Sequence, residues 1–336
     1  MLPLILPENY ESAIDLMESQ RAIKKIKDFF QQELAYGLQL RRVSAPLFVD
    51  PKTGLNDNLN GTERRVSFTL KDIDELEVEV VQSLAKWKRM ALGKYGIEPG
   101  HGIYTDMNAI RRDEDLDNLH SVYVDQWDWE KVITKEQRTE EYLKETVTTI
   151  YNAIKNLGDY VNRLYRNIQT EIPNDIFFIT TQELEDMYPD CTPKEREYKI
   201  AKLHGAVFIE QIGDKMKSGE KHDGRAPDYD DWSLNADIVV YYPVLDIALE
   251  LSSMGIRVDK KALLDQLQKA GCPERAELPY HKAVINGELP LTIGGGIGQS
   301  RICMFFLRKA HIGEVQCSLW SDEVMETAEK NGLQLL

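Results

Sequence analysis

Two acidic residues late in the chain could hold a divalent cation. Asp237 and Glu250 lie in the segment 237–257, which reads as two strands joined by a turn. With the turn centred between Pro243 and Val244, the two carboxylates would face each other about 5 Å apart and repel by about 3 kcal/mol at an effective dielectric of 20. Mg²⁺ would turn that repulsion into attraction, because it binds carboxylates together with substrate phosphates. A register one residue different would separate the pair, so both interpretations stay open.

A glycine-rich segment could hold phosphate. Residues 292–301 read Thr-Ile-Gly-Gly-Gly-Ile-Gly-Gln-Ser-Arg, between a short strand expected at 291–293 and an apolar helix expected at 302–307. Glycines before a helix N-terminus let backbone N–H groups approach a phosphate, and Arg301 would add a fixed cation. The segment lacks the third glycine of the dinucleotide fingerprint, and the chain has no P-loop motif. A plain glycine turn is the alternative.

The segment 120–130, His-Ser-Val-Tyr-Val-Asp-Gln-Trp-Asp-Trp-Glu, reads as an unusual strand. Alternation puts two tryptophans on one face and several polar residues on the other. The first face holds Tyr123, Asp125, Trp127 and Trp129, and the second holds Val122, Val124, Gln126, Asp128 and Glu130. Polar side chains on a half-buried sheet face are typical of the floor of a polar cleft. An edge strand with a solvated acidic face is the alternative.

Charged runs lie near this strand. Arg111 begins the run Arg-Arg-Asp-Glu-Asp, between the strand expected at 103–107 and the one at 120–130. A hairpin there could point the guanidinium at an anion held over the sheet, although a solvated charged loop is the commoner explanation.

The segment 228–232, Asp-Tyr-Asp-Asp-Trp, lacks EF-hand spacing and reads as an acidic surface turn. No His-Glu-x-x-His or Gly-x-Ser-x-Gly motif supports zinc hydrolysis or serine-esterase chemistry.

The elements that position these residues are helices and hairpins. A helix carrying Ile23, Ile26, Phe30 and Leu34 is expected to end at Gly37, before an extended stretch at 38–49 that contains Pro46. Alternating strands at 66–70 and 76–80 and a helix at 83–92 are expected next.

The longest helical signal covers 134–168 and fits an amphipathic helix on the core better than a seam between subunits. Thr180 and Thr192 begin capping boxes, and Gly205 is expected to end the second helix. Because strands come in hairpins as well as between helices, the pattern favours an α+β fold, with a mainly antiparallel sheet flanked by helices.

Composition narrows the class of partner. The 336 residues carry 41 Lys+Arg and 56 Asp+Glu, a formal net charge of −15, which argues against nucleic acid because phosphate backbones require a basic surface. No run approaches the ~20 apolar residues of a membrane span, so no membrane partner is expected. Four cysteines without a Cys-x-x-Cys spacing fit reduced thiols, and we expect a cytoplasmic protein.

Five segments in chain order carry a resemblance. They are Val-Val-Gln-Ser-Leu-Ala-Lys-Trp-Lys-Arg (80–89), the strand at 120–130, Arg-Ala-Pro-Asp-Tyr-Asp-Asp-Trp (225–232), Glu-Leu-Ser-Ser-Met-Gly-Ile-Arg-Val-Asp (250–259) and the glycine-rich segment at 292–301. Together they resemble the ammonia-dependent asparagine synthetase (aspartate–ammonia ligase) family. Arg112 departs from the family pattern, which has proline there.

The resemblance implies the catalytic fold of class II aminoacyl-tRNA synthetases and a homodimer. It implies one catalytic domain over 1–336, with a motif 1-like dimer element at about 10–50 and a helical insertion at about 134–205. Arg111 matches the motif 2 arginine, and Gly296-x-Gly298-x-x-Arg301 resembles motif 3. The implied substrates are aspartate, ATP and ammonia, the implied cofactor is Mg²⁺, and β-aspartyl-AMP is the implied intermediate.

Site roles follow from the same resemblance. Arg111, Arg301, Gln126 and Asp57 would be catalytic, and Asp237 and Glu250 would hold Mg²⁺. Aspartate and ammonia would bind Ser83, Lys88, Asp128, Asp230, Ser252 and Arg257, and the nucleotide would bind Arg111, Gly296, Gly298 and Arg301. Arg111, Arg301, Arg257 and Lys88 would then form a positive pocket inside an acidic outer surface.

Two other functions compete with the ligase. A free-standing aminoacyl-tRNA synthetase relative is disfavoured by the acidic charge and by the roughly forty residues before the motif 1 strand, too few for an anticodon-binding OB-fold. A non-catalytic regulatory paralogue should have lost some of the cations or metal acids, but Arg111, Arg301, Asp237 and Glu250 are all present.

Overall fold

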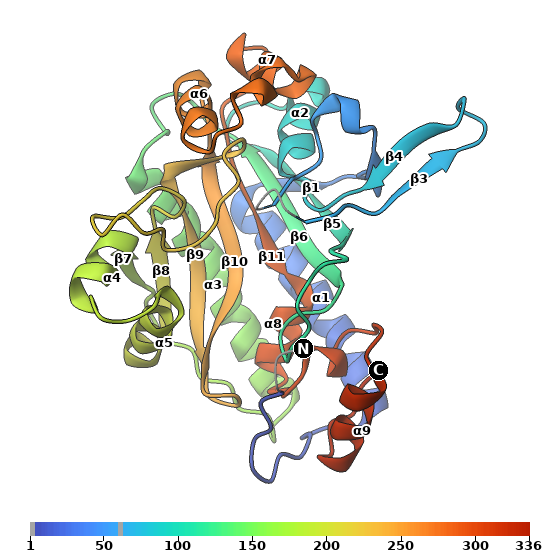
Figure 1. Ribbon diagram of the computed structural model, residues 1–336. Helices are drawn as coiled ribbons and strands as arrows, with labels where there is room; N and C mark the ends of the chain where they lie inside the picture. The colour runs from blue at the N-terminus through green and yellow to red at the C-terminus, as the bar shows by residue number, and fades with distance from the viewer. Residues whose placement is uncertain (1–3, 60–62) are drawn as a thin grey trace.

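An eight-stranded sheet forms the centre of the computed structural model, which describes residues 4–59 and 63–336 (Figure 1). In spatial order its strands are β1 (Leu40–Arg42), β5 (Gly102–Ile110), β6 (Tyr123–Val132), β11 (Thr292–Gly298), β10 (Ile247–Arg257), β9 (Asp230–Tyr242), β8 (Ala206–Glu210) and β7 (Phe177–Thr180). Pairing is antiparallel from β5 through β8, which fits the predicted hairpins.

Both edges of this sheet depart from the prediction. β1 pairs parallel with β5, and β7 pairs parallel with β8, so the sheet is mixed rather than mainly antiparallel throughout. A parallel pair needs a crossover connection. Helices α4 (Thr181–Met187) and α5 (Pro193–His204) supply it between β7 and β8, and both begin with the predicted capping boxes.

A three-stranded sheet lies beside the main one. It consists of β2 (Phe48–Val49), β4 (Leu76–Val80) and β3 (Ser67–Leu70), in that order, and the hairpin of β3 and β4 projects from the body of the molecule (Figure 1). The two predicted alternating strands and the helix after them, α2 (Ala85–Tyr95), are confirmed within a few residues.

Three helices cover one face of the main sheet and enclose the core. They are α1 (Leu16–Leu38), α3 (Glu140–Leu164) and α8 (Gln299–Phe306) (Figure 1). Trp127 and Trp129 of β6 are fully buried in this core, and the Phe30 ring of α1 packs on the Trp127 ring. The apolar stripe of α3 lies in the same cluster, which confirms that α3 is a core helix.

The remaining helices lie at the ends of the molecule. α6 (Lys260–Lys269) and α7 (Pro279–Ile285) gather near α2, and α9 (Asp322–Lys330) lies near the C-terminus (Figure 1). Short 3₁₀ turns occur at Pro51–Thr53, Pro273–Glu277 and Ile312–Glu314. None of the helices in the described part of the chain is long and apolar enough to cross a bilayer.

Gly37 does not end the first helix. α1 continues to Leu38, and Gln39 takes the left-handed conformation that terminates it, with φ 59°. A Cβ at position 37 would lie 3.0 Å from the Thr149 Cγ2 atom of α3. The glycine is therefore explained by close packing of α1 against α3 rather than by chain reversal.

The predicted glycine loop is also wrong, since Gly294 to Gly298 form strand β11 in the middle of the sheet. Gly294, Gly296 and Gly298 lie opposite Glu130, Asp128 and Gln126 of β6. Side chains at 294 and 296 would collide with Glu130 and Gln126. The alternating glycines therefore leave room for the polar face of β6, and β11 forms part of a cavity floor.

Candidate active site

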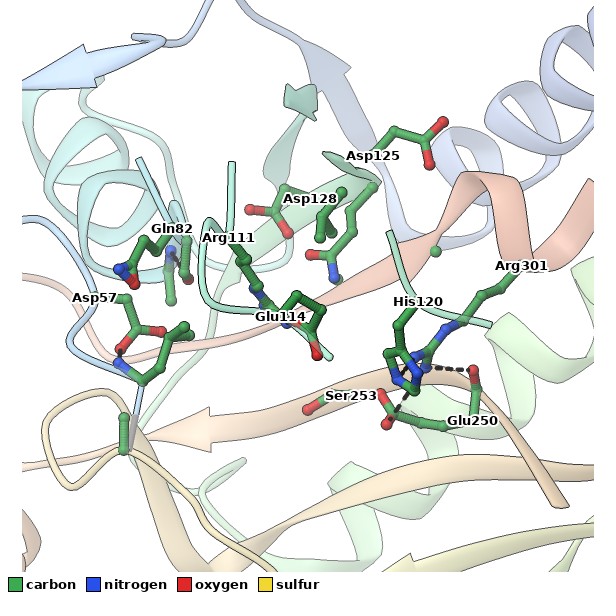
Figure 2. Close-up of a pocket in the computed structure, with 18 of the residues that line it drawn as sticks. Asp57, Gln82, Arg111, Glu114, His120, Asp125, Asp128, Glu250, Ser253 and Arg301 are labelled. Carbon is green, nitrogen blue, oxygen red and sulfur yellow. Dashed lines mark hydrogen bonds and ion pairs between the residues drawn. The ribbon is translucent and has the colours of Figure 1, made fainter. Parts of the chain in front are cut away.

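A cavity of about 510 Å³ lies over the polar face of β6, β10 and β11 (Figure 2). Twelve of the fourteen predicted site residues line it: Asp57, Ser83, Lys88, Arg111, Gln126, Asp128, Asp230, Glu250, Arg257, Gly296, Gly298 and Arg301. They come from segments separated by as much as 244 positions, which the sheet brings together. The cleft interpretation of the segment 120–130 is thereby confirmed.

The charge of the lining differs from the prediction. Six arginines and lysines face ten aspartates and glutamates in this cavity, so the expected positive pocket is wrong. The predicted cations are present, but each lies among carboxylates that the sequence pattern did not place there. A lining with both signs of charge suits ligands that have positively charged groups as well as phosphates.

Arg111 follows β5 at the mouth of a hairpin, and its backbone N–H donates to the Val122 carbonyl at 2.9 Å. Its side chain is 30% exposed, and its nearest carboxylate, that of Glu114, lies 4.0 Å away. The Nε atom is buried without a hydrogen-bond partner in the described part of the chain. The guanidinium thus faces the cavity with donors to spare, rather than forming a solvated surface pair.

Arg301 is held more tightly at the opposite end of the cavity (Figure 2). Its Nη1 donates to the Glu250 backbone carbonyl at 3.0 Å and lies 3.5 Å from the Glu250 carboxylate. Its Nη2 contacts His120 Nε2 at 2.9 Å, and His120 Nδ1 lies 2.9 Å from Asp117 Oδ1. Asp117 therefore favours the Nδ1–H tautomer, which leaves Nε2 free to accept from Arg301.

Lys88 and Arg257 form ion pairs beneath the cavity. Lys88 Nζ donates to the Gly295 carbonyl at 3.0 Å and lies 3.3 Å from Asp128 Oδ1, and burial lowers the pKa of this lysine. Arg257 Nη2 lies 2.7 Å from Glu130 Oε2, and its Nη1 donates to Asp230. Arg257, which lines the cavity, is therefore already paired with two carboxylates of the protein.

The segment 228–232 is not an acidic surface turn. Its aspartates are buried, because each has a cationic partner: Asp228 pairs with Lys86, Asp230 with Arg257 and Asp231 with Arg138. Burial of an unpaired carboxylate would cost much free energy through lost hydration, and the attraction within these ion pairs offsets part of that cost. The partners are remote in sequence, so composition alone suggested a solvated turn.

The predicted register of Asp237 and Glu250 is wrong. Asp237 lies opposite Ser253 and Glu250 opposite Val239, with a β-bulge between Glu250 and Ser252. The two carboxylates still interact, because burial together with the Glu250 charge raises the pKa of Asp237 to about 6 against the opposing effect of Arg225. Arg225 Nη2 lies 2.7 Å from Asp237 Oδ1 and separates Asp237 from the cavity lining.

Ser252 is the second predicted residue that does not line the cavity. Its hydroxyl donates to the Gly296 carbonyl at 3.1 Å, and Ser253 faces the cavity instead. The bulge shifts strand alternation at this point, and no feature of the sequence marks it.

Several cavity residues were not predicted as site residues. Gln82, His120 and Arg225 line the cavity, and Asn56 fixes two segments of its wall. Gln82 and Arg225 fall inside the motifs 80–89 and 225–232, so their place in those motifs was a usable signal. The role of Asn56 depends on contacts with β4, which local spacing does not reveal.

Comparison with known proteins gives a family match over almost the whole chain. The model of the aspartate-ammonia ligase family matches residues 17–332. The chain is 64% identical over 336 residues to an aspartate–ammonia ligase of Ruminiclostridium cellulolyticum, covering 100% of both chains. It is 61% identical over 327 residues to one of Fusobacterium nucleatum, covering 97% of this chain and 99% of the relative.

Solved structures show the same architecture at low identity. An Entamoeba histolytica asparaginyl-tRNA synthetase in complex with asparaginyl-adenylate superposes with a TM-score of 0.60 at 12% identity, covering 90% of this chain and 68% of that one. The Pyrococcus horikoshii enzyme gives a TM-score of 0.58 at 15% identity, with 90% and 70% covered. The fold is therefore that of class II aminoacyl-tRNA synthetases.

Proposed function

The chain belongs to the aspartate-ammonia ligase family, and on that premise we propose that it makes asparagine from aspartate and ammonia while ATP is split into AMP and pyrophosphate. It is an enzyme, and its substrates are small molecules. The observation that carries the proposed chemistry is the Arg111 guanidinium, which faces the cavity with a buried Nε that has no hydrogen-bond partner within residues 4–59 and 63–336. A phosphate bound at Arg111 would satisfy it.

In the first half-reaction the β-carboxylate of aspartate attacks the α-phosphorus of ATP. A new O–P bond forms, the bond to the leaving oxygen of pyrophosphate breaks, and β-aspartyl-AMP remains. Arg111 would bridge the α-phosphate and the attacking carboxylate, where negative charge is concentrated in the transition state. Arg301, fixed by Glu250 and His120, would hold the nucleotide phosphates or stack on adenine.

In the second half-reaction the nitrogen of ammonia attacks the activated side-chain carbonyl. The C–N bond forms, AMP leaves, and one proton is released from the new nitrogen. Gln126, Asp128 and Asp230 lie on the floor, where they would meet the reacting end of aspartate or its amino group. Lys88, Ser83 and Arg257 would bind its carboxylates, and Ser252 would act indirectly by holding the Gly296 carbonyl.

The carboxylates proposed to hold Mg²⁺ are Glu250, which lines the cavity, and Asp237, which would first have to exchange its ion pair with Arg225. Both are hard oxygen donors on neighbouring strands, and a divalent cation would offset both the burial that mainly raises the pKa of Asp237 and the smaller effect of the Glu250 charge. No cluster of three or more candidate ligand side chains occurs among the described residues, which suits an ion that takes its other ligands from phosphates and water. Such an ion would neutralise the phosphate charge.

We also infer a homodimer in the cytoplasm, with residues about 10–50 as the dimer element of a single catalytic domain that carries an insertion at about 134–205. Large apolar side chains are exposed on and after α1, including Met17, Tyr36 and Leu47. These residues would be covered by a second copy. Light scattering should then give twice the chain mass of 38.6 kDa.

The central experiment is incubation with ATP, aspartate and ammonium. The expected products are AMP, pyrophosphate and asparagine, and glutamine in place of ammonium should give little asparagine. ADP and phosphate as products would overturn the proposed chemistry. Aminoacylation of tRNA in a parallel assay would favour the synthetase alternative instead.

A further inference from the structure

The buried carboxylates of the cavity are not equivalent. Asp57, Asp125, Asp128 and Asp230 all line it with at most 7% of each residue exposed. Asp125 pairs with Lys27 at 3.0 Å, Asp128 with Lys88 at 3.3 Å, and Asp230 with Arg257. Among the described residues Asp57 has no cation within ion-pair distance. In the described part of the chain it is thus the buried aspartate of this cavity without an ion pair, and the more distant charges of Lys86 and Arg111 offset its burial only in part.

The two carboxylate oxygens of Asp57 also differ in their hydrogen bonds. Its Oδ1 accepts from the Leu59 backbone N–H at 2.9 Å, whereas its buried Oδ2 has no partner in the described part of the chain. Lys86, the lysine whose charge acts on Asp57, is already paired with another carboxylate, because its Nζ lies 3.0 Å from Asp228 Oδ2. Burial accordingly raises the pKa of Asp57, and a cationic ligand would reverse that effect.

A second acceptor lies beside this carboxylate. Gln82 is 1% exposed and lines the same cavity, and its Oε1 is also buried without a partner among the described residues. Asn56 joins the two segments: its Oδ1 accepts from the Asp57 N–H at 3.0 Å and from the Gln82 N–H at 2.9 Å. Figure 2 shows Asp57 and Gln82 together at one end of the cavity, with His120 and Arg301 at the other.

The amide nitrogen of the Asn56 side chain is hydrogen-bonded as well. Asn56 Nδ2 donates to Glu79 Oε2 at 3.1 Å and to the Val80 carbonyl at 3.2 Å, so both ends of the amide are engaged. The loop that carries Asp57 is therefore fixed against β4 before any ligand binds. Preorganised acceptors that are desolvated in advance favour a ligand that supplies only donors and positive charge.

We propose that Asp57 Oδ2 and Gln82 Oε1 form an ammonium subsite, in which Gln82 is a substrate-binding residue. An ammonium group is the complement of this pair, since it carries one positive charge, several N–H donors and no acceptor. The proposal rests on the proposed function, which brings two such groups to the cavity: the α-ammonium of aspartate and free ammonium.

The test separates these two sources with Gln82→Met, which keeps the length of the side chain and removes its acceptor. Aspartate-dependent ATP–pyrophosphate exchange without ammonium reports the first half-reaction, and ammonium saturation of AMP formation reports the second. Loss of a hydrogen bond to a charged group should raise one KM about tenfold or more and leave kcat within roughly twofold. A rise in the aspartate KM assigns the α-ammonium, and a rise in the ammonium KM alone assigns free ammonium.

Succinate inhibition, a second substitution of Gln82 and a control variant test the assignment further. Succinate, which is aspartate without its amino group, should inhibit the wild type and Gln82→Met equally if the α-ammonium occupies the subsite. Gln82→Glu retains an acceptor oxygen and should restore the affected KM to within about threefold of the wild type. Gln268→Met, on the exposed face of α6, should be kinetically unchanged.

Failure of the subsite is distinct from failure of the proposed function. A wild type that makes AMP and asparagine, with both KM values unchanged in Gln82→Met, overturns the subsite alone. Equal loss of both half-reactions through kcat, with both KM values unchanged, also overturns it. If the wild type makes no AMP, calorimetric titration with aspartate and with ammonium chloride still decides, since Gln82→Met must weaken one of them.

Discussion

Gly294 and Glu130 lie directly opposite each other across β11 and β6, and the Glu130 carboxylate fills the space that a side chain at position 294 would need. Glu130 is completely buried, and it holds Arg257 and accepts from the Thr292 hydroxyl at 2.7 Å. The glycine, the acid and the arginine therefore form one unit beneath the cavity floor, and a change in one should disturb the others.

Gly294→Ala should consequently destabilise the protein. The methyl group would displace Glu130 and leave Arg257 without one of its two carboxylates, at a cost of about 3 kcal/mol or more in the free energy of unfolding. Denaturant unfolding measures this cost. Gly93→Ala is the matched control, because a Cβ there meets only side-chain atoms at 3.3 Å (Pro290 Cδ) and 3.7 Å (Leu289 Cδ2), and we expect a change within about 1 kcal/mol. Equal effects of the two variants would contradict the packing argument.

Arg111→Ala should lower turnover far more than it weakens aspartate binding. Arg111 stabilises charge that develops on the α-phosphate, so we expect kcat for AMP formation to fall by roughly 10²–10³-fold. The aspartate dissociation constant, measured by calorimetry, should change by less than about tenfold. Arg112→Ala is the control, because that neighbouring arginine is exposed and outside the cavity lining. Comparable losses of turnover and of binding would show that Arg111 merely binds substrate.

Most of the site residues came from the family resemblance, and the residue pattern by itself predicted the faces of strands better than their registers. Alternation along 120–130 correctly placed Trp127 in the core and Asp128 on the cavity floor, because a period of two follows directly from strand geometry. The Asp237–Glu250 register failed, since the turn was placed one residue early and the bulge after Glu250 leaves no local signal.

Long-range pairing explains the remaining errors. Asp228 and Asp230 looked solvated because their partners, Lys86 and Arg257, lie 142 and 27 positions away. Gly294 looked like a turn residue because its reason for being glycine is a side chain on another strand. In both cases the deciding contact exists only after the sheet has formed, so composition and spacing could not reveal it.

Removal of divalent metal should abolish AMP formation, and addition of Mg²⁺ should restore it. If Glu250 supplies a metal ligand, Glu250→Gln should raise the Mg²⁺ concentration for half-maximal activity by about tenfold or more, because a neutral amide is a poorer ligand. Chelation with EDTA followed by Mg²⁺ titration measures this. Glu329→Gln, on the exposed face of α9, should titrate like the wild type. An unchanged midpoint in Glu250→Gln would remove Glu250 from the proposed metal site.

Glu210 should make stability depend on pH. Burial raises its pKa from 4.5 to about 7, opposed by Lys144 at 3.3 Å, and its Oε1 has no hydrogen-bond partner among the described residues. Between pH 4.5 and 7 the folded protein therefore binds more protons at this site than the unfolded chain does. The contribution of Glu210 to the free energy of unfolding must then fall as pH rises, by at most about 3 kcal/mol.

Glu210→Gln removes this titration without changing the size of the side chain. Its free energy of unfolding should match that of the wild type near pH 4.5 and exceed it by roughly 1–3 kcal/mol at pH 8. Urea unfolding of both proteins at the two pH values measures the difference. Glu140→Gln also faces Lys144, but its side chain is 43% exposed, so water screens it and no such pH-dependent gain is expected. A stability difference between Glu210→Gln and the wild type that is the same at both pH values would show that the Glu210 carboxyl ionises normally in the folded protein.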